Sequence, residues 1–82
     1  MTSYIATFFS HFGAIRFKKE LENLGTGVTL MPVPRAISSS CGTCAAFEAQ
    51  KLPEIKHPDE IEQVVYEDEN GKYVKVFSSD DI

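Results

Sequence analysis

The sequence contains no tryptophan and only two cysteines and two histidines among its 82 residues. Its apolar stretches are far shorter than the ~20 residues that a membrane-spanning helix needs. The segment Met1–Ala6 carries no basic residue, so we expect no signal peptide. A glycine-rich phosphate loop is also absent, and no nucleophile can be placed beside a base. These absences argue against phosphoryl transfer and hydrolysis.

The length of the chain predicts a single domain over residues 1–82. A domain of this size buries only about 60% of the surface that its unfolded chain exposes, which allows one small core. With 43% hydrophobic and 24% charged residues, the composition is that of an ordinary soluble globular protein. We therefore do not expect intrinsic disorder in the bulk of the chain.

The 12 acidic and 8 basic residues give a net charge of −4 that is unevenly distributed. Residues 1–52 hold five basic and three acidic residues, a net charge of +2, whereas residues 53–82 hold three basic and nine acidic residues, a net charge of −6. Because no basic stripe is present, nucleic acid is not an expected partner, and no membrane partner is expected either. The acidic end is typical of a solvated face that keeps a protein soluble.

The first part of the chain predicts a strand, a helix and a second strand. The β-branched and aromatic run Tyr4–Phe9 predicts a strand, and its nearly continuous apolar character is typical of the centre of a sheet. Ser10 is a good N-cap for a helix of about four turns, and Gly25 stands where such a helix ends. The second strand is expected at residues 27–32. The apolar stripe of the helix consists of Ala14, Phe17, Leu21 and Leu24.

A loop is expected at residues 32–42, because its two prolines exclude a helix and a central strand. A third strand is predicted at residues 43–48. The order strand, helix, strand with a tight connection is that of a split βαβ unit. We therefore predict a small α+β domain, ferredoxin-like in its first half, with a mainly antiparallel sheet.

Residues 59–68 admit two interpretations. Asp59–Glu62 has the form of a capping box, which would open a helix with Ile61, Val64 and Val65 on its buried face. Alternatively, Asn70-Gly71 is a strong turn signal and predicts a C-terminal β-hairpin. We favour the hairpin, preceded by a short helix. A two-residue turn would pair Val64 with Phe77, Tyr66 with Lys75, and Asp68 with Tyr73.

The motif Cys41-Gly42-Thr43-Cys44 is the one constellation that points to chemistry. In a reducing compartment the plain interpretation is a pair of inert, partly buried thiols. However, Cys41 follows a polar loop, and Arg35 lies within reach if that loop folds back. A cation beside a thiol lowers its pKa and increases the thiolate fraction. Cys41, Cys44 and Arg35 are therefore the candidate catalytic residues.

Three chemical functions remain open for this motif. It could cycle between dithiol and disulfide, although the expected strand after it lacks the helix N-terminus that assists redox motifs of this kind. Cys41 and Cys44 could bind zinc, but the remaining ligands would be His11 and His57, whose spacing fits no zinc finger. A carrier cysteine could accept a sulfur or selenium atom by the chemistry of disulfide exchange.

Residues 4–14 (YIATFFSHFGA) and 31–42 (MPVPRAISSSCG) resemble the selenium/sulfur carrier-like proteins, which are small bacterial domains. The resemblance covers residues 4–49, and its most specific part is the segment P-x-P-R-x-I-S-S-x-C-G. It implies chalcogen carriage by the cysteine of the Cys-Gly pair, here Cys41, with Arg35 as an accompanying site residue. It implies no cofactor.

On this basis we expect a cytoplasmic carrier rather than an independent enzyme. Its partners would be a cysteine desulfurase-like donor and an acceptor protein, with Cys44 as the resolving thiol. The alternatives are a non-catalytic or zinc-binding module and a small dithiol redox protein that uses Cys41 and Cys44. The aromatic residues of the expected hairpin are compatible with a homodimer contact, although core packing explains them more simply.

Overall fold

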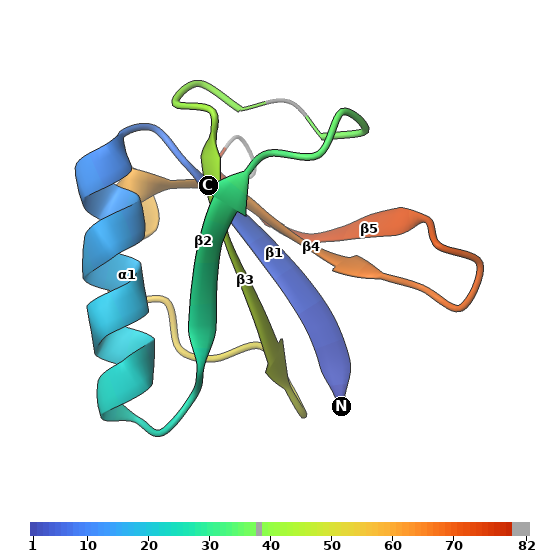
Figure 1. Ribbon diagram of the computed structural model, residues 1–82, viewed down its shortest axis with the longest axis horizontal. Coiled ribbons are helices and arrows are strands. Elements are labelled where there is room, and N and C mark those ends of the chain that lie inside the picture. Colours follow the sequence, from blue (N-terminus) through green and yellow to red (C-terminus); the bar gives the residue numbers. More distant parts are fainter. Residues whose placement is uncertain (38, 80–82) are drawn as a thin grey trace.

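The computed structural model describes residues 1–37 and 39–79, which form one helix, one short 3-10 helix and five strands (Figure 1). The elements in chain order are β1 (Thr2–Phe8), α1 (His11–Asn23), β2 (Val28–Pro32), β3 (Thr43–Ala49), η1 (Pro58–Glu60), β4 (Ile61–Glu67) and β5 (Tyr73–Ser78). The helix is not long enough or apolar enough to cross a membrane, and the described residues contain no other candidate.

The five strands form one sheet in the order β2-β3-β1-β4-β5, and every neighbouring pair is antiparallel. Strand β1 lies in the middle, with β3 on one side and β4 on the other. Its residues from Tyr4 to Phe8 are all buried. This confirms the central strand predicted from the apolar run, because only a strand covered on both faces needs apolar residues at consecutive positions.

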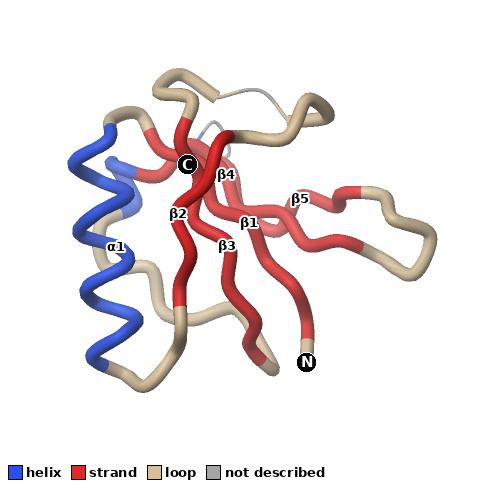
Figure 2. The backbone as a smooth tube through the Cα atoms, viewed as in Figure 1, coloured by secondary structure: helices blue, strands red, loops and turns tan. Residues whose placement is uncertain are grey.

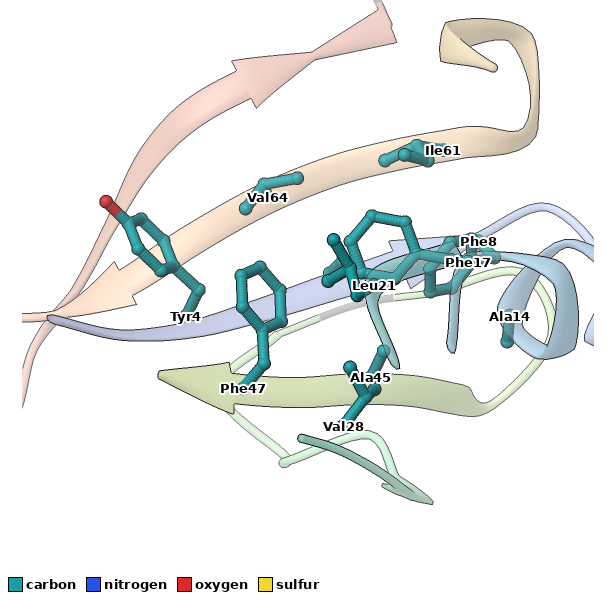
Figure 3. Close-up of a cluster of buried hydrophobic side chains, with 11 residues drawn as sticks. Tyr4, Phe8, Ala14, Phe17, Leu21, Val28, Ala45, Phe47, Ile61 and Val64 are labelled. Atoms are coloured by element: carbon teal, nitrogen blue, oxygen red, sulfur yellow. The ribbon is translucent and has the colours of Figure 1, made fainter. Parts of the chain in front are cut away.

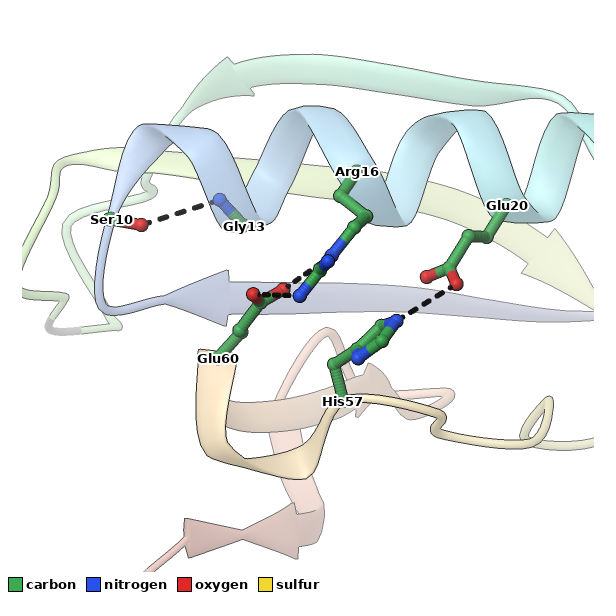
Figure 4. Close-up of polar contacts among 6 residues, drawn as sticks. All are labelled: Ser10, Gly13, Arg16, Glu20, His57 and Glu60. Carbon is green, nitrogen blue, oxygen red and sulfur yellow. Dashed lines mark hydrogen bonds and ion pairs between the residues drawn. The ribbon is translucent and has the colours of Figure 1, made fainter.

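The ends of α1 are set by capping residues. The hydroxyl of Ser10 accepts a hydrogen bond from the backbone N–H of Gly13 at 3.3 Å (Figure 4), as predicted for an N-cap. At the other end Gly25 has a φ of 89°, and its N–H and that of Thr26 donate to the carbonyls of Glu22 and Leu21. This is a Schellman arrangement, which favours glycine because the backbone is left-handed.

The helix covers one face of the sheet and forms the larger core with it (Figure 2). Figure 3 shows the aromatic rings that fill this core. The Phe17 ring packs against the rings of Phe8 and Phe47, with centroids 5.3 and 5.5 Å away. Ala14 and Leu21 are buried as expected. Leu24 is not: it forms the C-cap and is 66% exposed, because the chain leaves the helical path there.

Strands β1 and β2 lie on either side of β3, and both are antiparallel to it. They therefore run parallel to each other, with α1 connecting them. The structure is a small α+β domain with one helix and a five-stranded antiparallel sheet. The more specific ferredoxin-like assignment of the split βαβ unit remains a prediction.

Residues 50–60 connect β3 to β4 beside α1, and the last three of them form η1 (Figure 4). Two ion pairs fasten this segment: the guanidinium of Arg16 pairs with the carboxylate of Glu60, and Nε2 of His57 lies 3.2 Å from Oε2 of Glu20. The carbonyl of Glu60 also accepts from the N–H of Phe9 at 3.1 Å. Because this segment reaches the start of β4, it fixes β4 beside β1.

Residues 61–67 are a strand, so the alternative helix over this segment was wrong. Strand β4 pairs with β5 in an antiparallel register. Val64 pairs with Phe77 as expected, but Tyr66 pairs with Val74 and Glu67 with Tyr73. The register differs because residues 68–71 form a longer turn, with Gly71 at a φ of 79°, and β5 has an extra residue opposite the Val64/Val65 step. Those two irregularities cannot be read from an Asn-Gly pair.

The opposite face of the sheet carries a second, smaller core without a helix. It consists of Ile5, Cys44 and Val65 from three strands and Ile37 from the loop between β2 and β3. Ile37 is only 8% exposed. The loop that precedes Cys41 is therefore part of this core.

We expect the Phe17→Ala substitution to destabilise the protein by about 3–5 kcal/mol, because it leaves a cavity between two aromatic rings. That is a large part of the 5–15 kcal/mol that is typical of a whole domain. Phe12→Ala on the same helix is the matched control, since Phe12 is 66% exposed. Urea denaturation followed by circular dichroism measures both. Equal losses in the two variants would contradict the packing described above.

Candidate functional site

The candidate site is the loop of residues 33–42, which crosses the end of the sheet between β2 and β3 (Figure 1). The N–H of Val33 donates to the carbonyl of Gly42 at 3.2 Å and closes the neck of the loop. The turn at residues 34–37 and the turn at residues 40–42 lie on opposite sides of the loop in the figure. Ser38, which belongs to the sequence motif, lies outside the described residues.

The described part of this loop is attached to the sheet at three further points. The first is the buried side chain of Ile37. The second is the hydroxyl of Ser39, which donates to the carbonyl of Phe8 at 3.5 Å. The third is Ser40, whose N–H and hydroxyl both donate to the carboxylate of Glu62, at 3.0 and 2.6 Å. Residues on both sides of Cys41 are thus held against the ends of β1, β2 and β4.

Glu62 occupies an irregular position in β4. In the ladder with β1, Ile61 pairs with Phe8 and Gln63 pairs with Thr7, so Glu62 is an extra residue between the two pairs. Such a bulge bends the strand and redirects a side chain. Here the redirected carboxylate meets Ser40. Glu62 was not among the predicted site residues, because the bulge depends on pairing with a strand more than fifty residues away.

Cys41 is the more accessible of the two thiols. It is of intermediate exposure and packs against the edge of the larger core. Its Sγ donates a hydrogen bond to the carbonyl of Thr43 at 3.4 Å. Gly42, the next residue, has a φ of 74°, which favours glycine, and a Cβ built there would meet no atom within 4 Å. The glycine of the Cys-Gly pair is therefore favoured by the backbone conformation of the turn and not by lack of space.

Cys44 lies on β3 in the smaller core and is fully buried. Its Sγ donates to the carbonyl of Pro32 at 3.7 Å. Burial, together with the nearby Cys41 sulfur, raises the pKa of the Cys44 thiol. A thiol with a raised pKa is protonated at neutral pH and is a poor nucleophile. Both cysteines are free, and they pack against different cores.

Arg35 is exposed in the turn at residues 34–37, and its side chain pairs with no other described residue. The proposed role of Arg35 beside the Cys41 sulfur therefore stays a prediction. His11 is exposed at the start of α1, and His57 pairs with Glu20. Over residues 1–37 and 39–79, no group of three His, Cys, Asp or Glu side chains could hold a metal ion.

A comparison with known protein families decides the relationship of this chain. The family described as "Putative Se/S carrier protein-like" matches residues 3–70. The chain belongs to this family. No curated protein and no solved structure matches the chain. The resemblance noted in residues 4–49 thus extends through β4, so Glu62 lies within the matched region and β5 lies beyond it.

We predict that the two thiols differ in reactivity. In the folded protein iodoacetamide should modify Cys41 readily and Cys44 at least about tenfold more slowly, because the thiolate of a buried cysteine is disfavoured and inaccessible. Trypsin leaves both thiols in the peptide of residues 36–51, so fragmentation of this peptide in a tandem mass spectrometer measures the two rates. Unfolding in urea should make both thiols react. Faster labelling of Cys44 in the folded state would contradict the burial described here.

The bond between Glu62 and Ser40 predicts a dependence of stability on pH. Partial burial raises the pKa of Glu62, but the two hydrogen bonds donated by Ser40 act in the opposite direction, and this pKa lies below its usual value. A carboxyl group whose pKa is lowered by folding stabilises the folded state above its unfolded pKa of about 4.3. This stabilising contribution is lost as the pH falls through the lower pKa that Glu62 has in the folded state.

Glu62→Gln should therefore lose less free energy of unfolding than the wild type between neutral pH and about pH 3. Urea denaturation at both pH values measures this difference. The same acid sensitivity in the two proteins would show that folding does not lower the pKa of Glu62.

Proposed function

We propose that this protein carries a sulfur or selenium atom on Cys41 and passes it to an acceptor. The observation that supports this most strongly is the position of Cys41: a partly exposed thiol at a Cys-Gly turn, in a chain that belongs to a family described as Se/S carrier-like. A carrier thiol must be reachable by a partner protein, and a loop at the end of a sheet meets that need.

The loading step is a thiol exchange that is balanced without any oxidant. The Cys41 thiolate attacks the outer sulfur of a persulfide on a donor enzyme of the cysteine desulfurase type. A new sulfur–sulfur bond forms at Cys41, the donor's own bond breaks, and its cysteine leaves as a thiolate. With selenium the attacked atom is the outer selenium, and the rest of the step is unchanged.

Delivery repeats the same exchange with the acceptor as nucleophile and Cys41 as leaving group. Stabilisation of the Cys41 thiolate would favour both steps, and Arg35 and the backbone amides near Gly42 are the groups that we propose for this purpose. The resolving role of Cys44 would need attack of its thiolate on the inner sulfur, with release of hydrosulfide and formation of a disulfide. Burial and the raised pKa of Cys44 weigh against this step and favour direct transfer to an acceptor.

The test is intact mass after incubation with a cysteine desulfurase and cysteine, without reductant. We expect the wild type and Cys44→Ala to gain the mass of one sulfur atom, which dithiothreitol removes, and Cys41→Ser to gain none. Cys44→Ala is the matched control because it removes a thiol of the same motif but not the proposed carrier.

Full loading of Cys41→Ser would refute the proposal. A loss of two hydrogens by the wild type instead of a gain of sulfur would favour the dithiol redox protein. Stoichiometric zinc that resists dialysis would favour the metal-binding module.

A further inference from the structure

The carboxylate of Glu62 binds the residue directly before the proposed carrier thiol. One oxygen accepts the backbone N–H of Ser40 at 3.0 Å, and the other accepts the Ser40 hydroxyl at 2.6 Å. Hydrogen bonds to a charged acceptor are the stronger kind, and two of them to one residue restrict its orientation as well as its position. Ser40, the residue directly before Cys41, is therefore fixed to β4.

The rest of the loop supports this attachment. Ser39 is bonded to the carbonyl of Phe8, which pairs with Ile61, the residue next to Glu62. On the other side of Cys41, the carbonyl of Gly42 is bonded to the N–H of Val33. Cys41 lies between these points, and its Sγ donates a weak hydrogen bond to the carbonyl of Thr43. The described residues on both sides of Cys41 are thus attached to the sheet, and this attachment limits the positions that its sulfur can take.

The bulge makes this geometry specific to Glu62. In a regular ladder, side chains of successive residues point to opposite faces of the sheet, and none points along the end of the strand toward the loop. The extra residue in β4 breaks this alternation at the position where a carboxylate is found. Bulges of this kind are over-represented beside active sites.

We propose that Glu62 is a positioning residue of the carrier site, which holds Ser40 so that the Cys41 sulfur faces an incoming partner protein. This inference rests on the proposed function. It assigns no chemical step to Glu62, which acts on Cys41 only through Ser40. A thiol held in one orientation reacts faster with a protein-bound persulfide, because part of the entropy of alignment is already lost.

Loss of this contact should have opposite effects on two reactions. In Glu62→Gln, sulfur transfer from the donor enzyme to Cys41 should slow about tenfold, because the thiol is no longer aligned. The loss should appear mainly in the kcat of the donor enzyme with this variant as its sulfur acceptor. Labelling of Cys41 by iodoacetamide, a small reagent that needs no alignment, should become severalfold faster, because the freed loop exposes the sulfur. Cys44 should stay protected, because the smaller core is not altered.

Glu67→Gln is the matched control, since Glu67 is an exposed carboxylate on the same strand. It should leave both rates unchanged. Ser40→Ala removes the other partner and should slow transfer in the same direction. The double variant Glu62→Gln/Ser40→Ala should be less impaired than the product of the two single effects, because both substitutions remove one shared contact.

Equal rates of sulfur transfer and of Cys41 labelling in Glu62→Gln and Glu67→Gln would overturn the inference. Parallel increases in Cys41 and Cys44 labelling in Glu62→Gln would also overturn it, because they would mean general loosening of the fold. If Glu62→Gln fails to fold, Ser40→Ala takes its place: faster labelling of Cys41 with Cys44 still protected supports the inference, and unchanged labelling of Cys41 overturns it. If the wild type accepts no sulfur, the proposed function fails. The labelling rates of Glu62→Gln and Glu67→Gln still show whether Glu62 positions the loop.

Discussion

The sheet has two faces, and the described residues, 1–37 and 39–79, provide one long helix to cover them. Most features of this protein follow from that constraint. Helix α1 covers the face that carries Phe8 and Phe47. The central strand also carries apolar residues on the opposite face, and these residues must be covered as well. The loop between β2 and β3 closes this face with Ile37. A segment that bears a candidate functional cysteine is thereby bound into the core, which restricts its motion without a second helix.

The two cysteines differ because of this arrangement. Cys44 alternates with Thr43 and Ala45 along β3, so it points into the smaller core and its pKa is raised by burial. Cys41 precedes the strand, where the left-handed Gly42 turns the chain, and it keeps partial exposure. Identical side chains three residues apart thus have different chemistry. A Cys-x-x-Cys motif on a strand is therefore a different site from one at the start of a helix, where the helix dipole lowers the pKa of the first thiol.

Local features of the sequence were sufficient to predict α1 and β1 and insufficient to predict the position of Glu62. Ser10, Gly25 and the apolar run of β1 act through neighbouring residues, so the helix and the central strand could be predicted. The position of Glu62 depends on pairing between β1 and β4, and the register of β5 depends on the turn at Gly71. Ile37 was not predicted as a core residue, although a large apolar side chain directly before three serines is a signal that could have indicated an anchor for the loop. No local signal marked Glu62.

The central claim is that Cys41 both receives a chalcogen atom and gives it up. The most direct measurement is therefore release from the loaded protein: the persulfide form, freed of donor and cysteine by gel filtration, is treated with cyanide, which takes the outer sulfur as thiocyanate and leaves the Cys41 thiol. We predict one thiocyanate per chain, recovery of the original mass and renewed loading of the same molecules. A protein that releases no thiocyanate, or that keeps the added mass after the treatment, would contradict the account.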